Sequence, residues 1–198
     1  MANLIIKPTS GGSLILQDEG GDAALTVGTT GVSTIANATI TTGTIAAATA
    51  FPAGHIIQTV SYVNGTQVAT ASTSFSTSNK VSFGAITPQY ANSDILISGH
   101  ISLSANANAA YVFADIYKNA SDVTETANLT GYANGIIHMN DAVVWATTGY
   151  SWLDTCSENS TSAKTYGISV RAHSSGGSAT IGWGSSGASV MILQEIKR

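Results

Sequence analysis

The sequence has 198 residues, of which 9% are charged and 43% hydrophobic, and its formal net charge at pH 7 is −4. Only 7 residues are Lys or Arg, too few for the basic surface that neutralises phosphates, so nucleic acid is excluded as an expected partner. Solubility must then depend on neutral polar side chains, which lose little conformational entropy when they pack against a copy of the chain or a neutral polar ligand. This composition favours a component of an assembly.

Secretion, membrane insertion and disulfide bonding are all unexpected from this sequence. The apolar run near the N-terminus, Leu4 to Ile6, is too short for a signal peptide or a transmembrane segment. Cys156 is the only cysteine, so stability must come from packing or from association of several chains. No histidine lies near Cys156 in the sequence, and we expect a small, partly buried apolar residue there rather than a nucleophile.

The N-terminal part of the chain contains short apolar segments separated by turn residues. Three of these segments lie at 4–6, 14–16 and 24–27, and a Gly pair follows each of the first two. This spacing predicts a meander of short strands. Because so small a sheet has nothing in its own chain to cover its apolar face, we expect three copies to bury these faces around a threefold axis, as a homotrimer.

Thr-Ile pairs recur downstream of this meander with a constant spacing, and they end at Ile35, Ile40 and Ile45. The spacing matches neither helix nor strand periodicity, so each isoleucine can be the single inward residue of a short repeat. On this interpretation the three isoleucines line the axis of a trimeric stalk. The alternative is a low-complexity linker, and the sequence leaves open whether residues 28–50 are ordered.

The segment FPAGHIIQ, Phe51 to Gln58, separates this region from the rest of the chain. Pro52 biases the preceding residue toward an extended conformation, and Gly54 permits a bend. The β-rich sequence that follows is long enough to bury a core of its own. We therefore predict a stalk region over residues 1–50 and a compact head over residues 51–198.

Strand-like segments recur through the head, and none of them has the pattern of an ordinary amphipathic helix. Residues 94–105 alternate apolar and small residues and predict a central core strand. Asn64-Gly65 is favoured in two-residue hairpin turns and predicts that residues 67–75 return alongside residues 56–63. The sequence thus predicts an all-β fold with a jelly-roll-like antiparallel β-sandwich as the head.

Candidate metal ligands and catalytic residues are sparse. The four histidines lie far apart and show no His-x-His spacing: His55, His100, His138 and His173. Asp18, Glu19 and Asp22 flank a Gly pair, where acidic residues are more often solvated turn residues than calcium ligands. Neither a nucleophile elbow nor a phosphate-binding loop occurs in the sequence. We therefore expect no enzymatic activity, no metal and no cofactor.

Aromatic residues are concentrated in the head and include the best candidates for ligand contacts. Tyr132 lies in a Gly- and Asn-rich stretch, and Tyr150 lies in a later predicted strand. An exposed tyrosine beside Asn and Ser is typical of sites for neutral glycans, because the ring packs on the apolar face of a sugar while amides contact its hydroxyls. We name Tyr132 and Tyr150 as candidate platforms for a sugar ring, with burial in the core or an interface as the alternative.

Several segments resemble those of known virion proteins. The opening LIIKPTSGGSLILQDEGGDAALTV is similar to the N-terminal segment of tail-fibre-like proteins of marine and cyanobacterial bacteriophages, and FPAGHIIQ, SDILISGHISLSA and SVMILQEIK are similar to the β-sandwich head of such proteins. The resemblance implies a homotrimeric virion component, assembled in the host cytoplasm and exposed on the particle. Its N-terminal region would attach to other virion proteins, and its head would face the host surface and a host glycan.

Three functions are consistent with this sequence. The first is a short tail fibre or tail appendage with an adhesin-like head, because the predicted stalk is short for a long fibre. The second is a capsid decoration or head-fibre protein. The third is a depolymerase that cleaves a glycan. The resemblance supplies no catalytic or ligand-binding residues, so the choice depends on where the protein lies on the particle.

Overall fold

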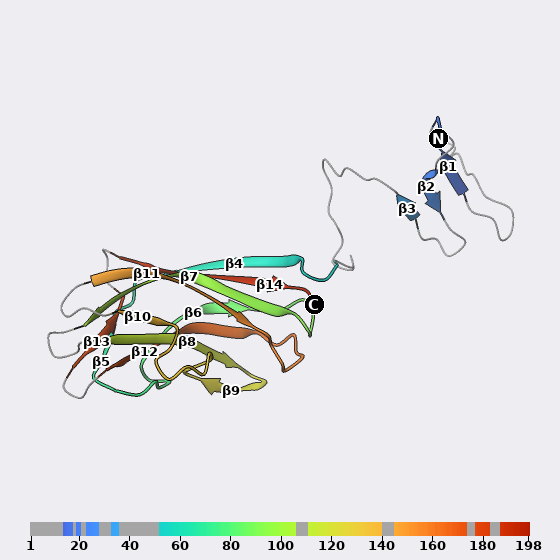
Figure 1. Ribbon diagram of the computed structural model, residues 1–198. Helices are drawn as coiled ribbons and strands as arrows, with labels where there is room; N and C mark the ends of the chain where they lie inside the picture. Colours follow the sequence, from blue (N-terminus) through green and yellow to red (C-terminus); the bar gives the residue numbers. More distant parts are fainter. Residues whose placement is uncertain are drawn as a thin grey trace, which may run out of the picture. The chain divides into compact units, whose positions relative to one another are not determined.

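The computed structural model of the protein describes residues 14–17, 19–20, 23–27, 33–35, 52–105, 111–139, 145–173, 177–182 and 187–198. The chain divides into two compact units, Met1–Thr49 and Ala50–Arg198. Every secondary-structure element in the described ranges is a β-strand (Figure 1), so the predicted all-β class is confirmed. Those ranges contain no helix of the length and hydropathy that crossing a membrane requires.

The first unit contains a small antiparallel sheet. Its strands β1 (Leu14–Gln17), β2 (Ala23–Val27) and β3 (Ser33–Ile35) pair in sequence order. The short strands expected in this region are therefore present, although the apolar segment at residues 4–6 lies outside the described residues. On β1, Ile15 and Leu16 are 49% and 50% exposed, so the single chain leaves apolar side chains of this sheet uncovered.

The isoleucines predicted for a trimer axis fall mostly outside the described ranges. Ile35 is the last residue of β3, where its backbone pairs with Leu25 of β2. Ile40 and Ile45 lie outside the described residues. The axial role of these three residues, and the homotrimer, stay predictions.

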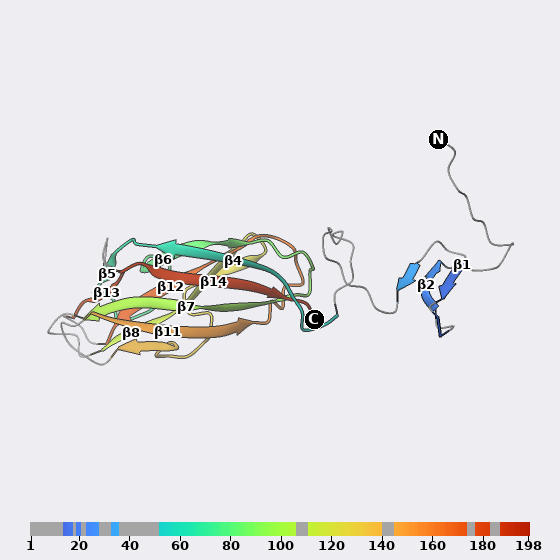
Figure 2. The ribbon, with the colours of Figure 1, turned by 90° about the horizontal axis from the view of Figure 1, so that it is seen from above.

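The second unit is a sandwich of two antiparallel sheets, which we name after their central strands. The β7 sheet contains, side by side and in this order, β4 (Ile56–Asn64), β14 (Ser189–Ile196), β7 (Asp94–Ala105) and β11 (Trp145–Asp154) (Figure 2). Beyond β4 and β14 the same sheet is extended by β5 (Val68–Thr70) and β13 (Ala179–Ile181). The β8 sheet contains β6 (Lys80–Ile86), β12 (Lys164–Ala172) and β8 (Val112–Ala120), with β9 (Val123–Thr126) and β10 (Ile137–Met139) along the other edge of β8.

The strand order is that of a jelly roll. A jelly roll has eight strands, and three of them are each interrupted here, so that each is formed by two short strands in line along the same neighbour: β4 with β5, β9 with β10, and β13 with β14. When each such pair is counted as one strand in chain order, the β7 sheet contains strands one, eight, three and six side by side. The β8 sheet contains strands two, seven, four and five. The chain thus crosses repeatedly between the two sheets, and the predicted jelly-roll-like sandwich is confirmed.

The hairpin predicted at Asn64-Gly65 is wrong. β4 pairs with β14, whereas β5 pairs with β13 and continues in the direction of β4. The Asn64 side chain explains the sidestep, because its Oδ1 accepts a hydrogen bond from the Thr66 backbone N–H at 2.7 Å and its Nδ2 donates to the Ser82 carbonyl at 2.6 Å. These two bonds hold the chain at an Asx turn where it passes from β4 to β5.

The prediction of a central core strand at residues 94–105 is confirmed. β7 is paired along both edges, and its side chains Ile95, Ile97, Ile101 and Leu103 are fully buried. Period-2 alternation accounts for this burial, since every second residue points into the space between the sheets. Gly99 interrupts the apolar row because a Cβ there would lie 2.0 Å from the Val190 carbonyl oxygen.

The two ends of the sandwich can be defined by where strands begin and end. At one end the chain enters β4 and finishes after β14, and the Gly54 N–H donates to the Lys197 carbonyl at 2.7 Å. We call this the junction end. At the opposite end β7 finishes at Ala105 and β8 begins at Val112, and β10 and β12 also finish there. We call this the distal end.

Candidate functional site

The outward face of the β8 sheet is covered by two loops. Alternation on β8 directs Val112, Ala114 and Ile116 into the core and Phe113, Asp115 and Tyr117 to the other face, yet all six are buried. The residues that follow β5 cover part of this outward face, where the Ser76 carbonyl accepts a hydrogen bond from the Ser169 hydroxyl at 3.1 Å. Residues 127–136, between β9 and β10, cover another part. We call these residues the 127–136 loop.

Asp115 anchors the 127–136 loop. The Thr130 hydroxyl donates to its carboxylate at 2.8 Å, and the Ile116 backbone N–H donates at 2.7 Å. Burial raises the pKa of Asp115 to about 6, because these hydrogen bonds only partly compensate for the loss of water. The Leu129 N–H also donates to the Ile116 carbonyl at 2.8 Å, so the loop continues the pairing along the edge of β8 between β9 and β10.

Gly135 lets the end of the same loop approach β8 closely. Its φ of +66° lies in the left-handed region that favours glycine, and a Cβ there would lie 2.2 Å from the Ala114 carbonyl oxygen. The close approach places Gly135 and the neighbouring Asn134 beside the start of β8. A glycine in this Asn- and Gly-rich stretch is therefore needed for packing as well as for the turn.

Arg171, on β12, joins both covering loops to the sheet. Its guanidinium lies 4.2 Å from the centre of the Phe113 ring and 5.4 Å from that of Phe75. Its NH2 group donates to the Asn134 side-chain oxygen at 2.8 Å, and its NH1 group donates to the Thr73 carbonyl at 3.3 Å. Burial lowers the pKa of Arg171. A planar, stacked guanidinium with fixed donors holds the three segments in one arrangement.

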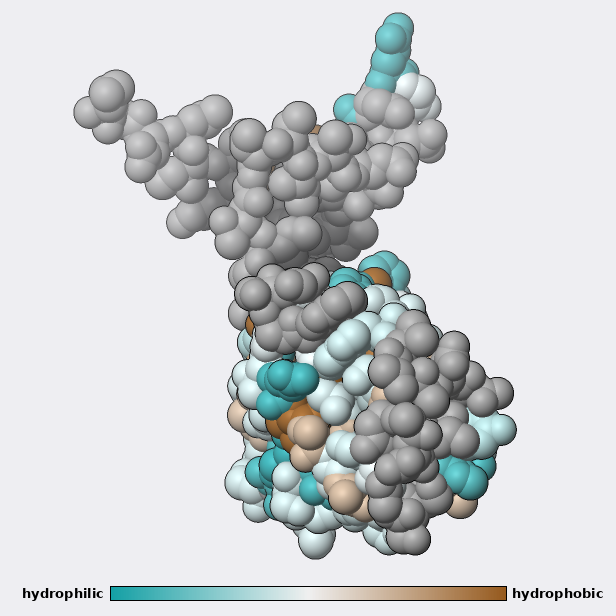
Figure 3. Space-filling model, turned by 90° about the vertical axis from the view of Figure 1, so that its left-hand side faces the viewer, coloured by the Kyte–Doolittle hydropathy of each residue, from teal (hydrophilic) through white to brown (hydrophobic). Residues whose placement is uncertain are grey.

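A hollow of about 500 Å³ opens beside Arg171 at the distal end, within the size range of ligand pockets, about 300–1,000 Å³. It is lined by Tyr111, Phe113, Asn134, Gly135, His138 and His173. Three of these residues form an aromatic cluster. The His173 ring packs edge-on against Tyr111 with ring centres 5.0 Å apart, and Tyr111 lies nearly parallel to Phe113 at 6.3 Å. Figure 3 looks at this end of the sandwich, where the described surface is mostly pale, with small brown patches beside teal ones.

The polar side chains that line the hollow can form more hydrogen bonds than the described residues give them. Among the described residues, nothing hydrogen-bonds to the Tyr111 hydroxyl or to the side-chain nitrogens of His138 and His173. Asn134 uses its side-chain oxygen for Arg171, and within the described ranges its amide NH₂ donates to nothing. These groups can donate or accept hydrogen bonds from a ligand that lies against the aromatic rings.

The two tyrosines predicted as sugar platforms have different environments. Tyr132 is 57% exposed at the tip of the 127–136 loop, and its ring packs edge-on against Trp152 at 6.0 Å. The expected exposure of Tyr150 is wrong, because this residue is 8% exposed. It pairs with Gly99 and occupies the space that the missing Cβ leaves, with its hydroxyl donating to the Val190 carbonyl at 3.1 Å. Neither tyrosine lines the hollow.

The sequence interpretation missed the residues that do line it. The sequence indicates His138 and His173 only as possible metal ligands. In the structure, the pairing of β8 with β10 and β12 brings both histidines close to Tyr111. The available signal was alternation, since His138 is an exposed residue between buried Ile137 and Met139. Periodicity alone can place such a residue on a surface, but it cannot show which distant residues share that surface.

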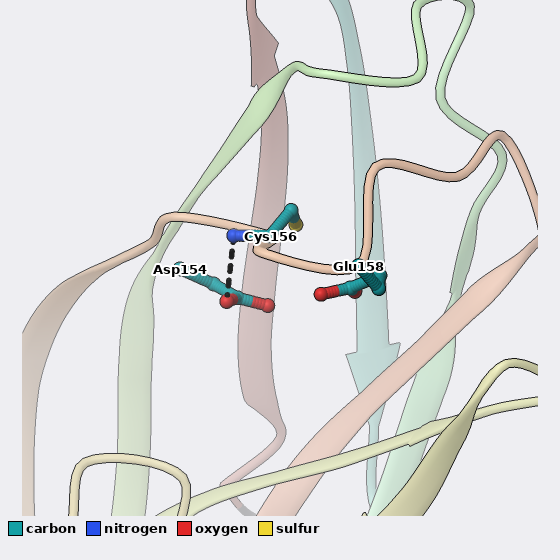
Figure 4. Close-up of side chains that lie close together, drawn as sticks. All are labelled: Asp154, Cys156 and Glu158. Atoms are coloured by element: carbon teal, nitrogen blue, oxygen red, sulfur yellow. Dashed lines mark hydrogen bonds between the residues drawn. The ribbon is translucent and has the colours of Figure 1, made fainter.

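A second cluster, at the junction end, has the composition of a metal site. Asp154, Cys156 and Glu158 present three ligand atoms within 4.8 Å of one another (Figure 4). However, the Lys118 ammonium already lies 2.7 Å from the Asp154 carboxylate and 2.6 Å from that of Glu158. The buried Lys164 ammonium lies 3.4 Å from Glu158 as well. Two lysines therefore supply the positive charge that a metal ion would bring.

The protonation of this cluster follows from the same contacts. Burial would raise the pKa of Asp154, but hydrogen bonds from Lys118 and from the Tyr166 hydroxyl outweigh it and hold the pKa below its usual range. Burial and the Asp154 charge raise the pKa of the Cys156 thiol to about 12. A protonated thiol is a poor nucleophile and a poor metal ligand. Cys156 is 2% exposed, so it is a buried core residue rather than the partly buried residue expected.

Comparisons with known proteins give matches among solved structures only. No family model matches this sequence, and no curated protein sequence is significantly similar to it. Among solved structures, the chain is similar to that of infectious bursal disease virus Gx strain, with 12% identity, a TM-score of 0.36, and coverage of 72% of this chain and 37% of that one.

Two further solved structures are similar at the same level. One is the VP2 subviral particle of infectious bursal disease virus, with 12% identity, a TM-score of 0.35, and coverage of 71% of this chain and 37% of that one. The other is the CBM22-1 xylan-binding domain from Paenibacillus barcinonensis Xyn10C, with 11% identity, a TM-score of 0.30, and coverage of 75% and 99%. Similarity of this size carries no argument about what the chain binds or assembles into.

Proposed function

We propose that the protein is a short tail fibre or tail appendage of a bacteriophage particle and that its head binds the host surface. In this proposal the N-terminal unit attaches the protein, as a homotrimer, to other virion proteins. The observation that carries the proposal is the hollow at the distal end, because it lies opposite the point at which the chain enters the head. A ligand site in that position is suited to an outward-facing contact.

Composition and chemistry support this proposal. A chain with 9% charged residues presents neutral polar groups, which suit contacts with copies of itself and with neutral surface ligands. The half-exposed Ile15 and Leu16 of β1 support burial of that small sheet in an assembly. The described residues that line the hollow include no carboxylate, the group that most glycosidases use for acid-base cleavage, and this supports binding rather than depolymerisation at this site.

The test is the position of the protein on the particle together with its effect on adsorption. Antibody-labelled electron microscopy of purified particles should place the label at the tail, and an excess of the purified full-length chain should slow adsorption of the phage to its host. A label spread over the capsid at a copy number near that of the capsid lattice would instead identify a decoration protein. Release of oligosaccharides from host polysaccharide would identify a depolymerase.

A further inference from the structure

We propose that the hollow at the distal end is a binding site for a neutral saccharide, held by Tyr111, His173, His138 and Asn134. This inference rests on the proposed function in host attachment and names the chemical class of the ligand. The proposed site does not include Tyr132 or Tyr150, the two residues that the sequence indicates as candidate platforms for a sugar ring.

The aromatic cluster provides the surface on which a sugar ring packs. Tyr111 is partly exposed and His173 is exposed, while Phe113 beneath them is 7% exposed and fixes their positions. The C–H groups on one face of a pyranose are apolar and pack against aromatic rings, as in many mostly apolar ligand sites with a few polar groups.

The polar groups around these rings match the hydroxyls of a sugar. The Tyr111 hydroxyl and the two imidazoles can each donate or accept, and the Asn134 amide NH₂ can donate. None of these groups forms a hydrogen bond with another described residue. A site built to hydrogen-bond a ligand distinguishes strongly against compounds that lack the matching groups, because its polar atoms then stay unpaired.

The charges near the hollow favour a neutral rather than an acidic sugar. Among the described residues, none that lines the hollow is Asp, Glu, Lys or Arg. Arg171 is stacked on Phe113, and its NH1 and NH2 groups already donate to three backbone carbonyls and to Asn134. A sugar carboxylate or sulfate would lose water on binding without gaining a lysine or arginine partner among the described residues that line the hollow.

The hollow is also held in a fixed shape before any ligand binds. Arg171 fixes Asn134, and Gly135 fits closely against the Ala114 carbonyl. Thr130, in the same loop, is held by Asp115. A preformed site loses less conformational entropy on binding, which matters for a weak ligand such as a single sugar unit.

The experiment is binding of the purified full-length chain to an array of neutral and acidic glycans, followed by titration calorimetry with the best oligosaccharide. We expect neutral glycans to bind. Two variants, His173→Ala and Tyr111→Phe, should each weaken binding about tenfold, which corresponds to about 1.4 kcal/mol. The matched control is His100→Ala, an exposed histidine on β7 of the other sheet, and it should leave the affinity unchanged. Thermal unfolding of each variant establishes that it is folded.

The outcomes separate this inference from the proposed function. Retention of acidic glycans only, retention of no glycan, or equal affinity of the hollow variants and the wild type would each overturn the saccharide site. Loss of binding in Tyr132→Ala but not in His173→Ala would move the site to the exposed loop tip. If the full-length chain still slows phage adsorption in any of these cases, host attachment stands while the neutral-saccharide inference fails.

Discussion

The two ends of the β-sandwich differ in how far their polar side chains are paired within the protein. At the junction end, buried charges are matched by opposite charges or by several hydrogen bonds. Lys118, Asp154, Glu158 and Lys164 form one ion-pair cluster in which Lys118 is 4% and Lys164 is 0% exposed. At the distal end, the described side chains that line the hollow are polar or aromatic and have unused hydrogen-bonding capacity. The paired charges at the junction end stabilise the fold, whereas the polar groups at the distal end can still bind a ligand.

Glu195 shows how completely the junction end is satisfied. Its carboxylate is fully buried and accepts hydrogen bonds from the backbone N–H groups of Gln89 and Tyr90, from the Ser93 hydroxyl at 2.6 Å and from the Gln58 amide at 2.7 Å. These donors come from the loop between β6 and β7 and from β4. A single carboxylate thus ties the end of β14 to the loop before β7. Full satisfaction of this kind stabilises a buried charge but leaves nothing for a ligand.

The largest effect that this comparison predicts comes from removing the central cation of the junction end. In Lys118→Met, the carboxylates of Asp154 and Glu158 keep their burial but lose their shortest ion pairs. We expect the free energy of unfolding at pH 7 to fall by about 3–5 kcal/mol, the usual loss when one partner of a buried ion pair is removed. Denaturant unfolding measures this difference.

The matched control is the exposed ion pair on the outward face of the β8 sheet. Lys80 pairs with Glu125 and Tyr117, and the side chains of Lys80 and Glu125 are 27% and 34% exposed. Because water screens this pair, Lys80→Met should lower the free energy of unfolding by only about 0–1 kcal/mol. Equal losses in Lys118→Met and Lys80→Met would show that the junction-end cluster is not a buried ion-pair network.

A smaller effect is predicted at Asp115, a buried carboxylate that hydrogen-bonds to Thr130 but has no cation beside it among the described residues. Its pKa of about 6 in the folded state lies above the ordinary 3.8, so the folded state binds a proton more tightly than the unfolded state does. Stability from this group is therefore lost as the pH rises from about 4 to about 6. The loss is on the order of 3 kcal/mol, since one pKa unit corresponds to about 1.4 kcal/mol.

The measurement is the difference in unfolding free energy between Asp115→Asn and the wild type as a function of pH. The amide keeps an oxygen for Thr130 and has no charge to bury, so the variant should gain stability relative to the wild type between pH 4 and pH 7. Asp122→Asn is the control, because hydrogen bonding to Ser160 and the charge of Lys164 lower the pKa of the exposed Asp122, and its pH dependence should have the opposite sign. A difference for Asp115→Asn that does not change with pH would contradict the raised pKa.

The fold could be predicted from the sequence because its signals are local. Alternation over residues 94–105 identified the central strand, and the spacing of strand-like segments identified the sandwich. The failure at Asn64-Gly65 has a non-local cause. The turn dipeptide is present, but the Asn64 side chain bonds to Ser82 and the chain continues forward. A dipeptide preference cannot register a partner that far along the chain.

The candidate site could not be predicted, because its residues meet only in the folded state. Tyr111, His138 and His173 are separated in the sequence and come together because β10 and β12 both pair with β8. Tyr150 was expected at the surface because composition cannot show that it faces Gly99. The ion pairs of Lys118 and Lys164 could not be predicted from the sequence either, because a lysine in a strand is normally expected to be solvated.

The smallest predicted effect on stability is at the distal end itself. The His138 side chain is exposed, lines the hollow and has no hydrogen-bond partner within the described ranges, so we expect it to contribute little to the stability of the sandwich. His138→Ala should change the free energy of unfolding by no more than about 0.5 kcal/mol, as for exposed residues without such contacts. Thermal and denaturant unfolding of the full-length chain test this directly. A loss as large as that in Lys118→Met would mean that the distal end is also held together by its polar residues, and the contrast between a closed end and a ligand-accepting end would no longer hold.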